Sequence, residues 1–398
     1  MKLVVPDLSA IEEVLTRGVV DVVVADHLRQ QLLSGRRLRV KFGIDPTSPH
    51  LHLGHVVPLM KLRQFQDLGH QAILIVGDAT AMIGDPTGRS ETRAQLTKEQ
   101  VIENQKTYLE QAAKILNMDT LEVRHNGEWY FPMSASDFLA LTSLVTVQQV
   151  LQREDFRARV DDPEHPLSAI ELTYPIMQGY DSVVTKADVE IGGRDQLLNV
   201  LMGRRIQRRY GMPEQDVLTV SLLEGTDGAR KMSKSFGNII ALEDAPYEMY
   251  GKVMSIPDGS IVHYLTLLTD VPLVEIQDLG KRLDSGALNP RDAKDRLARE
   301  IVSFFFGKEE AARAAEGFKK MFQAKEIPEE MIELKIKGRK KVIDVLVESK
   351  IVKSKGEARR QVEQGGVKVE GKVVSDINAE VSAGAVIQKG KRFFVRLV

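Results

Sequence analysis

Two histidines three positions apart, His52 and His55, are the first residues in the chain whose types and spacing suggest chemistry. Side chains three positions apart lie on one face of a helical turn, so both imidazoles can face the same ligand. Gly54 between them leaves room for a nucleotide base or ribose to approach the backbone. Without a second motif, two histidines at this spacing are more often solvated residues after a turn. Metal binding is disfavoured, because no acidic residue or further histidine accompanies the pair at a useful spacing.

A basic pentapeptide, KMSKS at residues 231–235, provides a second group suited to phosphate chemistry. It follows residues 224–228, which include two glycines. Lys231 and Lys234 on a mobile loop can close over a triphosphate and neutralise the charge that grows on a leaving pyrophosphate. A basic pentapeptide alone is usually part of the surface. Its occurrence together with the histidine pair, in this order, is specific and favours nucleotide chemistry.

Three polar side chains, Tyr174, Gln178 and Asp181, are spaced four and three positions apart. A helix would place all three on one face, directed at one ligand. The alternative is that they are capping or surface residues. That alternative is weaker for Asp181, whose neighbours are apolar and aromatic, because a buried carboxylate needs a partner.

These groups must be positioned by the alternation of β-like runs and helical stretches that fills roughly the first 220 residues. The alternation predicts an α/β fold, a doubly wound, Rossmann-like parallel sheet with covering helices. The β-like runs are 39–44, 72–77, 121–125, 187–192 and 217–222. Helices are expected over 55–68 and over 97–116, the latter with Thr97 as N-cap and Gln100 as its capping-box partner. The histidine pair follows the first strand, at the sheet edge where such proteins bind nucleotides.

The rest of the chain divides into a helical stretch and a basic tail. Over residues 246–325 strand-like runs vanish, and charge-patterned stretches at 291–305 and 309–322 indicate an α-helical domain. A linker over 327–338 leads to the tail. Residues 337–398 hold 15 basic and 7 acidic residues, a net charge of about +8, so the preceding residues carry 40 basic and 49 acidic. A basic tail on an acidic body indicates a nucleic-acid partner more often than a merely solvated face.

Composition narrows the class of protein. The 398 residues are 43% hydrophobic and 28% charged, which is typical of a globular protein with more than one domain. The chain contains no cysteine, which excludes disulfides, thiolate nucleophiles and cysteine-ligated zinc. No apolar run approaches the roughly 18 residues that a membrane span needs. The first residues fit neither a secretory signal nor a transit peptide, so we expect a cytoplasmic protein with no membrane partner.

At these motifs the chain resembles the class I aminoacyl-tRNA synthetases. Their HIGH signature corresponds to residues 52–55, and their KMSKS loop to residues 231–235, matched letter for letter. Residues 84–89, 174–181 and 192–196 resemble the amino-acid-binding and ribose-binding segments of the bacterial tyrosyl branch of this family. The resemblance covers nearly the whole chain.

The resemblance also implies how the chain is divided. Segments 354–360 and 365–369 are similar to the RNA-binding domain named after ribosomal small-subunit protein four. The domains it implies are a catalytic domain over 1–230 with an inserted dimerisation segment around 125–165, the KMSKS loop with a helical anticodon-binding domain over 231–327, and the RNA-binding domain over 339–398. The basic residues of the tail expected to contact RNA are Lys350, Lys353, Lys355, Arg359 and Arg360.

The activity that the resemblance implies is tyrosine–tRNA ligation by a homodimer. L-tyrosine would be activated with ATP to tyrosyl-adenylate and pyrophosphate, and then transferred to the 3′-terminal adenosine of tRNA(Tyr). The tyrosine carboxylate is ionised at neutral pH and can attack the α-phosphate directly, so the protein mainly aligns reactants and stabilises charge. Mg²⁺ is expected on the ATP phosphates, held largely by phosphate and water, so no metal-binding residues are expected.

The resemblance assigns roles to individual residues. Tyr174, Gln178 and Asp85 would receive the ammonium of tyrosine, while Asp181 accepts a hydrogen bond from its phenol. Gln196 would line the same cavity, with Lys41 as a further tyrosine contact. The residues expected to bind ATP are Asp45, His52, Gly54, His55, Gly192, Asp195, Leu222, Lys231 and Lys234. Of these, Asp195 would hold the ribose, and the two histidines and two lysines would be catalytic.

Three positions depart from the family pattern. Lys41 stands where one branch has a tyrosine that donates to the phenol, and another bacterial branch shares this lysine before its GIDPT-type motif. Phe42 follows, at a position that often holds a small residue in contact with the ribose. Arg194 stands where a small hydroxyl residue is usual. These departures affect the second phenol contact and the surroundings of the ribose.

Three other functions compete with this interpretation. The sister enzyme for tryptophan shares the fold and both signatures, but the segment around Asp181 and the tail argue against it. A non-catalytic RNA-binding protein would not need the intact histidines and lysines. An adenylyltransferase acting on a small acid without RNA would leave the basic tail without a role.

Overall fold

The computed structural model describes residues 4–87, 96–323, 331–336, 338–352, 354–390 and 393–398. The chain divides into two compact units, Met1–Arg313 and Ala314–Val398, which are described separately. Within the described ranges, no helix combines the length and the apolar character needed to cross a membrane.

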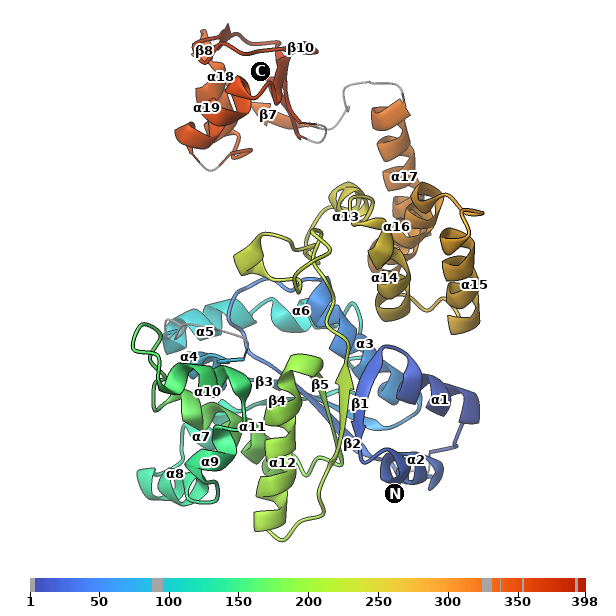
Figure 1. Ribbon diagram of the computed structural model, residues 1–398, viewed down its shortest axis with the longest axis vertical. Coiled ribbons are helices and arrows are strands. Elements are labelled where there is room, and N and C mark those ends of the chain that lie inside the picture. The colour runs from blue at the N-terminus through green and yellow to red at the C-terminus, as the bar shows by residue number, and fades with distance from the viewer. Residues whose placement is uncertain (1–3, 88–95, 324–330, 337, 353, 391–392) are drawn as a thin grey trace. The chain divides into compact units, whose positions relative to one another are not determined.

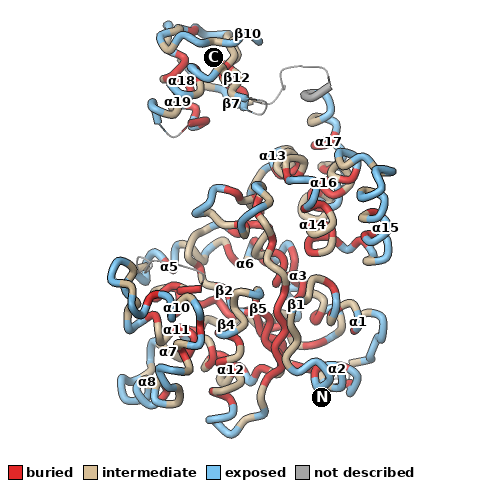
Figure 2. The backbone as a smooth tube through the Cα atoms, viewed as in Figure 1, coloured by how far each residue is buried: buried red, intermediate tan, exposed pale blue. Residues whose placement is uncertain are grey.

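The first unit is built on a six-stranded sheet with strand order β1-β6-β5-β2-β3-β4 (Figure 1). The strands are β1 (Val19–Val23), β2 (Arg39–Ile44), β3 (Gln71–Val76), β4 (Glu122–His125), β5 (Val189–Gly193) and β6 (Asp216–Val220). Strands β2 to β6 pair in parallel, and β1 pairs antiparallel with β6. The five predicted runs are thus confirmed as the parallel strands, and Figure 2 shows them as a largely buried centre of this unit.

The sequence prediction missed strand β1. Its five residues include Asp21, and none of them is fully buried. Four of the five residues are valines, so the apolar run was present in the sequence, but the strand is an antiparallel edge strand and falls outside the alternation of parallel strands and helices that guided the prediction. The strand that begins at Arg39, predicted as the first, is therefore the second along the chain.

The chain changes its direction across the sheet beside β2. From β2 it proceeds to β3 and β4 on one side, and then returns to β5 and β6 on the other side. Because parallel crossovers are right-handed, α3 (Leu53–Asp67) after β2 and α12 (Leu197–Arg209) after β5 cover opposite faces. Helix α3 packs on β2, β3 and β5, and α12 packs on β5 and β6. The doubly wound prediction is confirmed, with a topological switch point between β2 and β5.

Several helices connect β3 to β5. Helix α11 (Tyr174–Val184) packs against α12 so closely that a Cβ at Gly179 would lie 3.0 Å from the Met202 carbonyl carbon. This contact fixes the rotation of α11 about its axis. The other helices between β3 and β5 are α4 (Thr80–Ile83), α5 (Lys98–Gln105), α6 (Tyr108–Ala112), α7 (Gly127–Tyr130), α8 (Ala135–Thr142), α9 (Val147–Val150) and α10 (Glu154–Val160), while α1 (Leu8–Thr16) and α2 (Ala25–Leu33) precede β2.

The single helix predicted over 97–116 is wrong, because the structure has two helices there, α5 and α6. The predicted capping box between Thr97 and Gln100 is present at the start of α5. The hydrogen-bond pattern of α5 ends at Lys106, whose N–H donates to the Glu103 carbonyl, and the next residue, Thr107, donates its hydroxyl to the Pro49 carbonyl at 2.6 Å. The break therefore supports the loop that leads to the histidine pair.

The first unit ends in a helical part, as predicted. Its helices are α13 (Pro246–Val253), α14 (Ile261–Leu268), α15 (Leu273–Asp284) and α16 (Pro290–Phe306), and α17 (Lys308–Gln323) runs across the division between the units. The Arg17 guanidinium donates to the carbonyls of Thr266 and Thr269 at 3.1 and 2.9 Å, which satisfies groups at the carboxyl end of α14.

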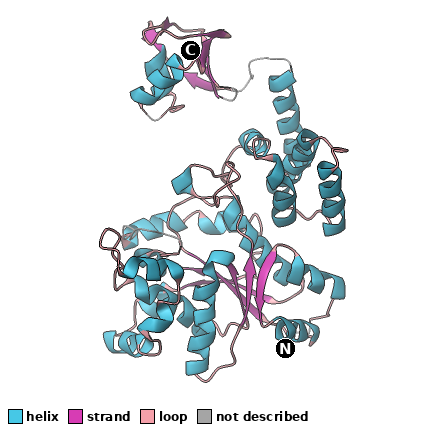
Figure 3. Cartoon of the chain, in the orientation of Figure 1, coloured by secondary structure: helices cyan, strands magenta, loops and turns pink. Residues whose placement is uncertain are grey.

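The second unit is a small α+β domain, which confirms the prediction for the tail. Helices α18 (Val342–Glu348) and α19 (Lys355–Glu363) pack against a sheet with strand order β10-β9-β12-β13-β7 (Figure 3). The strands are β7 (Ile332–Leu334), β8 (Lys340–Lys341), β9 (Val367–Val369), β10 (Lys372–Val373), β11 (Glu380–Val381), β12 (Val386–Lys389) and β13 (Phe393–Leu397), with β8 and β11 forming a separate pair.

Strand β7 lies inside the segment predicted as a linker, 327–338. It pairs in parallel with β13, and Leu334 and Ile336 pack against the core of the second unit. The short, mostly exposed strand gives little sequence signal, since its side chains are partly covered only by long-range pairing. The folded part of the tail therefore begins earlier than the sequence indicated.

Candidate active site

A cavity of about 280 Å³ lies at the topological switch point of the first unit. Its wall comes from the carboxyl ends of β2, β3, β5 and β6 together with residues of α3 and α11. It brings together most of the predicted site residues, namely Asp45, Gly54, His55, Asp85, Tyr174, Gln178, Asp181, Gly192, Asp195, Gln196 and Leu222. Phe42 also lines the cavity, whereas Lys41, His52, Lys231 and Lys234 do not.

The predicted helical face of α11 is present, since Tyr174, Gln178 and Asp181 all line the cavity. Asp181 is 4% exposed, and burial raises the pKa of its carboxyl group to about 7. The Trp129 indole Nε1 donates to Asp181 Oδ1 at 3.0 Å, and the Asn126 amide donates to Oδ2 at 3.4 Å. These donors favour the charged form and oppose the effect of burial, and they fix the Asp181 carboxyl group in the cavity wall.

A second cavity carboxylate, Asp45, follows β2. Burial raises the pKa of Asp45 to about 7, even though the Thr80 hydroxyl donates to Oδ1 at 2.7 Å and the Tyr174 hydroxyl donates to Oδ2 at 2.9 Å. Gly77 is required beside it, because a Cβ there would lie 2.0 Å from Asp45 Oδ1. The arrangement links the end of β2 to the first residue of α11.

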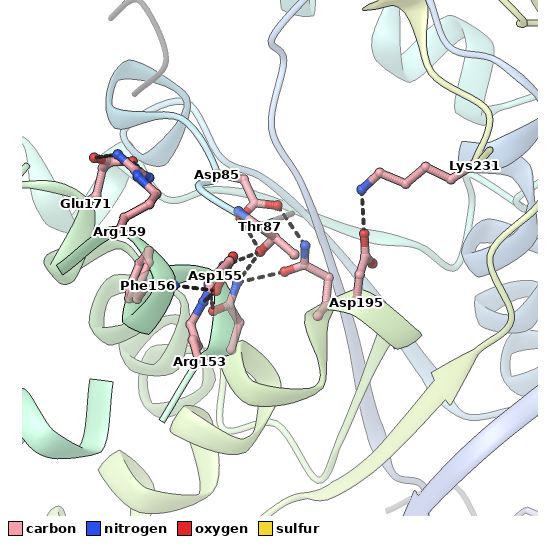
Figure 4. Close-up of polar contacts among 11 residues, drawn as sticks. Asp85, Thr87, Arg153, Asp155, Phe156, Arg159, Glu171, Asp195 and Lys231 are labelled. Atoms are coloured by element: carbon pink, nitrogen blue, oxygen red, sulfur yellow. Dashed lines mark hydrogen bonds and ion pairs between the residues drawn. The ribbon is translucent and has the colours of Figure 1, made fainter. Parts of the chain in front are cut away.

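A third carboxylate, Asp85, is held from two sides (Figure 4). The Gln196 amide donates to Asp85 Oδ2 at 2.7 Å, while the backbone N–H and hydroxyl of Thr87 donate to Oδ1 at 3.0 and 2.6 Å. The Arg153 guanidinium in turn donates to the Thr87 hydroxyl at 3.0 Å. Asp85 is thus fixed as an acceptor in the cavity wall, which Gln196 also lines. Gly88 and Arg89 of the same predicted segment lie outside the described residues.

Lys41 is not part of the cavity wall, although the sequence suggested a tyrosine contact. Its side chain is 1% exposed, and its ammonium donates to the Gln178 carbonyl at 2.9 Å and to the Ser182 hydroxyl at 2.6 Å. The ammonium also lies 3.2 Å from Glu190 Oε1. Two hydrogen bonds and an ion pair thus hold the ammonium behind the cavity wall, so Lys41 is poorly placed to donate to a phenol.

The histidine pair begins α3, with His52 as its N-cap. The Gly54 N–H donates to His52 Nδ1 at 3.2 Å, and the His52 N–H donates to His55 Nδ1 at 3.2 Å. Because each Nδ1 accepts a hydrogen bond, the proton of each neutral ring is on Nε2. Burial, followed by the neighbouring His55 and Lys234, lowers the pKa of His52 to about 2, and burial followed by Lys234 lowers that of His55 to about 4. Both rings are neutral N–H donors at pH 7.

The KMSKS loop contacts residues on both sides of the switch point, one after β5 and two after β2. The Lys231 ammonium lies 2.8 Å from Asp195 Oδ2, just after β5 (Figure 4). The Lys234 ammonium donates to the Ser48 hydroxyl and the His50 carbonyl, in the loop after β2. Both lysines therefore lie next to the cavity without forming its wall. A ligand could replace the groups that they contact here.

Arg194, the other departure from the family pattern, points away from the predicted ribose position. Its Nε lies 3.2 Å from Asp21 Oδ2 on the edge strand β1, and its side chain is 53% exposed. It does not line the cavity.

In the second unit the predicted RNA-binding residues differ in their surroundings. Arg359 and Arg360 are exposed on α19, and Lys350 is exposed after α18. The Lys355 ammonium forms an ion pair with Asp344 at 2.8 Å. The fifth predicted residue, Lys353, lies outside the described residues.

Sequence reasoning missed several residues that support the cavity. Trp129 and Asn126 hold Asp181, Thr80 holds Asp45, and Glu190 contacts Lys41 from β5. One signal was available, since Trp129 is the single tryptophan of the chain. Within the described ranges, no group of three or more His, Cys, Asp or Glu side chains is arranged to hold a metal ion.

Comparison with known families gives the class of protein that this fold and site define. The family model described as tRNA synthetases class I (W and Y) matches residues 33–323, and the chain belongs to this family. The domain described as Tyrosine--tRNA ligase SYY-like C-terminal domain matches residues 318–396.

Similar proteins indicate which of the two amino acids of this family is the substrate. A tyrosine–tRNA ligase of Thermotoga maritima is 50% identical over 97% of this chain and 96% of its own length, and one of Dehalococcoides mccartyi is 47% identical over 98% and 99%. The chain accordingly has tyrosine–tRNA ligase activity, with tyrosine, ATP and tRNA(Tyr) as substrates. The tryptophan-specific, non-catalytic and RNA-independent alternatives do not agree with these relatives.

Solved structures share the fold. A C-terminally truncated mitochondrial tyrosyl-tRNA synthetase of Coccidioides posadasii is 25% identical, with a TM-score of 0.64 over 78% of this chain and 92% of that chain. The corresponding Aspergillus nidulans structure is 24% identical, with a TM-score of 0.66 over 79% and 95%. The second likeness concerns the fold alone.

Proposed function

We propose that the cavity holds L-tyrosine and ATP together and joins them as tyrosyl-adenylate, before the tyrosyl group passes to the 3′-terminal adenosine of tRNA(Tyr). One observation carries the proposal. The tyrosine candidates of α11 line the same cavity as His55 and Gly54 at the start of α3 and Asp195 after β5. An amino acid and a nucleotide bound there would be in contact, which is the main requirement of this reaction.

Tyrosine recognition in this proposal uses both ends of the substrate. Asp181, held by Trp129, accepts a hydrogen bond from the phenol. The ammonium is received by Asp85, Tyr174 and Gln178, which all line the cavity and whose side chains carry oxygens that can accept a hydrogen bond. The Gln196 amide supports this role, because its donation to Asp85 leaves that carboxylate as an acceptor for a cation.

ATP recognition in this proposal starts from α3. The neutral rings of His52 and His55 carry their protons on Nε2, which makes them hydrogen-bond donors suited to phosphate oxygens at a helix N-terminus. Asp195 accepts from the ribose hydroxyls after Lys231 leaves it. The other proposed nucleotide contacts are Asp45, Gly54, Gly192 and Leu222.

The chemical step needs alignment more than proton transfer. The ionised carboxylate of tyrosine attacks the α-phosphate, the bond to the β-phosphate breaks, and pyrophosphate leaves. Lys231 and Lys234 move from Asp195 and the Ser48 hydroxyl to the phosphates and stabilise the charge that develops there. In the second step a ribose hydroxyl of the tRNA attacks the tyrosyl carbonyl carbon, and AMP leaves.

Magnesium fits this site as a companion of ATP. The described residues hold no metal-binding cluster, so the ATP phosphates and water would hold the ion, with Lys231 and Lys234 on the neighbouring loop. When bound, Mg²⁺ supplies positive charge at the pyrophosphate oxygens.

The tRNA is proposed to bind through the helical region, 231–327, and the basic tail, 339–398. Arg359 and Arg360 support this assignment, because they are exposed on one helix and suit phosphate contacts. The catalytic domain is assigned to 1–230. A cytoplasmic location belongs to the same proposal, because the enzyme must meet tRNA where translation takes place.

Homodimer formation through the segment around 125–165 is also proposed. Four apolar side chains of this segment are 45% to 68% exposed, namely Phe131, Leu139, Val147 and Val160. Apolar groups gathered in one surface segment are typical of a protein interface. Sedimentation of the purified protein tests this part, and a monomer at micromolar concentration would contradict it.

ATP–pyrophosphate exchange with each of the twenty amino acids tests the activation step. We expect exchange with tyrosine alone, and aminoacylation of tRNA(Tyr) in a second assay. Exchange in the Gln178→Met and Asp181→Ala variants at an unchanged tyrosine KM would show that the cavity is not the tyrosine site.

A further inference from the structure

A buried ion pair lies behind the cavity wall. The side chains of Lys41 on β2 and Glu190 on β5 are each 1% exposed, and their charged atoms are 3.2 Å apart. Neither residue lines the cavity. Burying two charges removes their hydration, so a pair of this kind persists only where its remaining hydrogen bonds are made. What those hydrogen bonds hold is therefore informative.

Glu190 gathers donors from three further side chains. Oε1 accepts from the Gln178 amide nitrogen at 3.1 Å, and Oε2 accepts from the Ser182 hydroxyl at 3.1 Å. The Gln215 amide also donates to Oε2. Lys41 contacts two of the same residues, since its ammonium donates to the Gln178 carbonyl and the Ser182 hydroxyl. The ion pair thus connects β2 and β5 to α11, the helix that carries the tyrosine candidates.

The contact with Gln178 has a chemical consequence at the cavity. A glutamine side chain has one end that donates, Nε2, and one that accepts, Oε1, and it can turn either end toward a ligand. Here Nε2 is committed to Glu190, while Oε1 has no partner within the described part of the chain. The reverse orientation would set two oxygens against each other beside a buried carboxylate. The hydrogen bond to Glu190 therefore favours the orientation in which the Gln178 carbonyl oxygen is available to a ligand.

We propose that Glu190 is a positioning residue that fixes the Gln178 amide with its carbonyl oxygen toward the ammonium of tyrosine, and that Lys41 holds Glu190 in place for this purpose. The inference rests on the proposed function, in which Gln178 receives the ammonium. An ammonium has donors only, so a Gln178 side chain turned the other way would repel it. Lys41 thus acts on tyrosine through Glu190 and Gln178.

The test compares two ligands that differ only in the ammonium. L-tyrosine has it, whereas 3-(4-hydroxyphenyl)propionate keeps the phenol and the carboxylate and lacks it. Trp129, the single tryptophan, donates to Asp181 in the cavity, so its fluorescence can report the binding of both ligands. The ratio of the two dissociation constants measures how well the protein recognises the ammonium, whatever the overall affinity.

The Lys41→Met/Glu190→Met double variant removes the acceptor of Gln178 without leaving an unpaired buried charge. We expect the preference for tyrosine over its ammonium-free analogue to fall about 10- to 100-fold, the range of a hydrogen bond to a charged group. Lys41→Met/Glu190→Leu, which also removes both charges, provides the same measurement if the first double variant does not fold.

Glu190→Gln is the matched conservative variant. Its Oε1 can still accept from Gln178 and Lys41, and its new amide can donate to Ser182 Oγ or to Gln215 Oε1, which is buried without a partner. We expect this variant to keep the wild-type preference. Equal weakening of both ligands in the methionine variants, with an unchanged ratio, would overturn the inference and leave the ion pair a purely structural role.

Gln178→Met separates this inference from the function on which it rests. If Gln178→Met leaves the ratio unchanged, the proposed recognition of the ammonium by Gln178 is wrong. If Gln178→Met lowers the ratio and the Glu190 variants do not, the proposed function stands and the positioning role of Glu190 is wrong.

Discussion

The Lys231 ammonium and the Asp195 carboxylate form an ion pair of 2.8 Å that joins the KMSKS loop to the end of β5. In the proposed mechanism both groups bind ATP, Asp195 at the ribose and Lys231 at the phosphates. Before ATP binds, the charge of each group is therefore balanced by the other. Exchange of this contact for the nucleotide couples ribose binding to release of the lysine that stabilises the leaving group.

Replacing either loop lysine should slow activation without weakening tyrosine binding. We expect Lys234→Ala to raise the barrier to adenylate formation by about 2–4 kcal/mol, as for the loss of one preorganised donor, because the charge it meets is greatest in the transition state. Lys231→Ala should be less severe, since it also frees Asp195 for the ribose. Pyrophosphate exchange gives the rates, and Trp129 fluorescence gives the tyrosine affinity.

Lys281→Ala, on the exposed end of α15, is the control. A variant that only weakened tyrosine binding would assign the loop another role.

Asp181→Ala should lose discrimination between tyrosine and phenylalanine. Phenylalanine leaves the buried carboxylate facing a bare ring, so the wild-type protein loses a hydrogen bond and keeps the desolvated charge. Discrimination of about 100,000-fold is already known for tyrosyl-tRNA synthetases and does not come from this structure. Exchange rates with the two amino acids measure the ratio. Full preference for tyrosine in Asp181→Ala would mean that the phenol is recognised by another group, and Lys41 is a poor candidate because its ammonium is held behind the cavity wall.

The prediction for α11 succeeded because spacing alone decides which side chains share a helical face. The positions of Tyr174, Gln178 and Asp181 follow from 3.6 residues per turn once the helix is assigned. The parallel strands were found for a similar reason, since strands buried on both faces are continuous apolar runs, as in β3.

Other features depend on partners far along the chain. Lys41 is 149 positions from Glu190, and no local pattern indicates that an ammonium in a strand will be buried by a carboxylate from another strand. The break between α5 and α6 is similar, because it is stabilised by the contact of Thr107 with Pro49, 58 positions away. Sequence therefore predicted the parallel strands and one face of the site, whereas β1, β7, the break between α5 and α6 and the arrangement behind that face required the structure.

Asp45→Asn should stabilise the fold at high pH. Burial raises the pKa of Asp45 from 3.8 to about 7, so the folded state binds its proton more tightly than the unfolded state. The stability that this proton provides is complete below about pH 4 and is lost as the pH rises through 7. At pH 8 the neutral asparagine should raise the free energy of unfolding by about 2 kcal/mol. This is roughly half of the free energy that corresponds to a shift of three pKa units, because water in the cavity screens the charge.

Thermal unfolding at pH 8 and pH 4 measures the effect. Asp284→Asn, exposed at the end of α15, is the control, and an equal gain at both pH values would contradict the explanation.

His52→Ala should lower the rate of activation while tyrosine affinity is unchanged, since the neutral ring donates to phosphate oxygens. Burial keeps the pKa of His52 at about 2 and that of His55 at about 4, so neither ring changes its charge between pH 5.5 and 9. At saturating tyrosine and ATP, the exchange rate should therefore have no inflection near pH 6.5 from these residues. An inflection there that disappears in His52→Ala would show that the ring acts as an acid or base.

The last prediction separates the two half-reactions by separating the two units. Every residue of the cavity wall lies between Phe42 and Leu222, inside the first unit, so tyrosine activation needs no part of the tail. Charging needs a long RNA to be held, and the tail has the basic residues for it. The cut belongs after Gln323, where α17 ends, and not at Gly338, because a cut at Gly338 would leave β7 without its partner β13.

A protein ending at Gln323 should retain ATP–pyrophosphate exchange and lose most charging of tRNA(Tyr) at physiological salt. In the full chain, replacing the exposed Arg359 and Arg360 by alanine should weaken tRNA binding and make its dependence on salt shallower, by a slope of about 0.7–0.9 for each phosphate that the protein no longer neutralises. Arg209→Ala, an exposed arginine at the end of α12 and outside both proposed tRNA-binding regions, is the matched control. Normal charging by the truncated protein would show that the tail is not needed to hold tRNA, and loss of exchange would mean that the tail stabilises the catalytic unit.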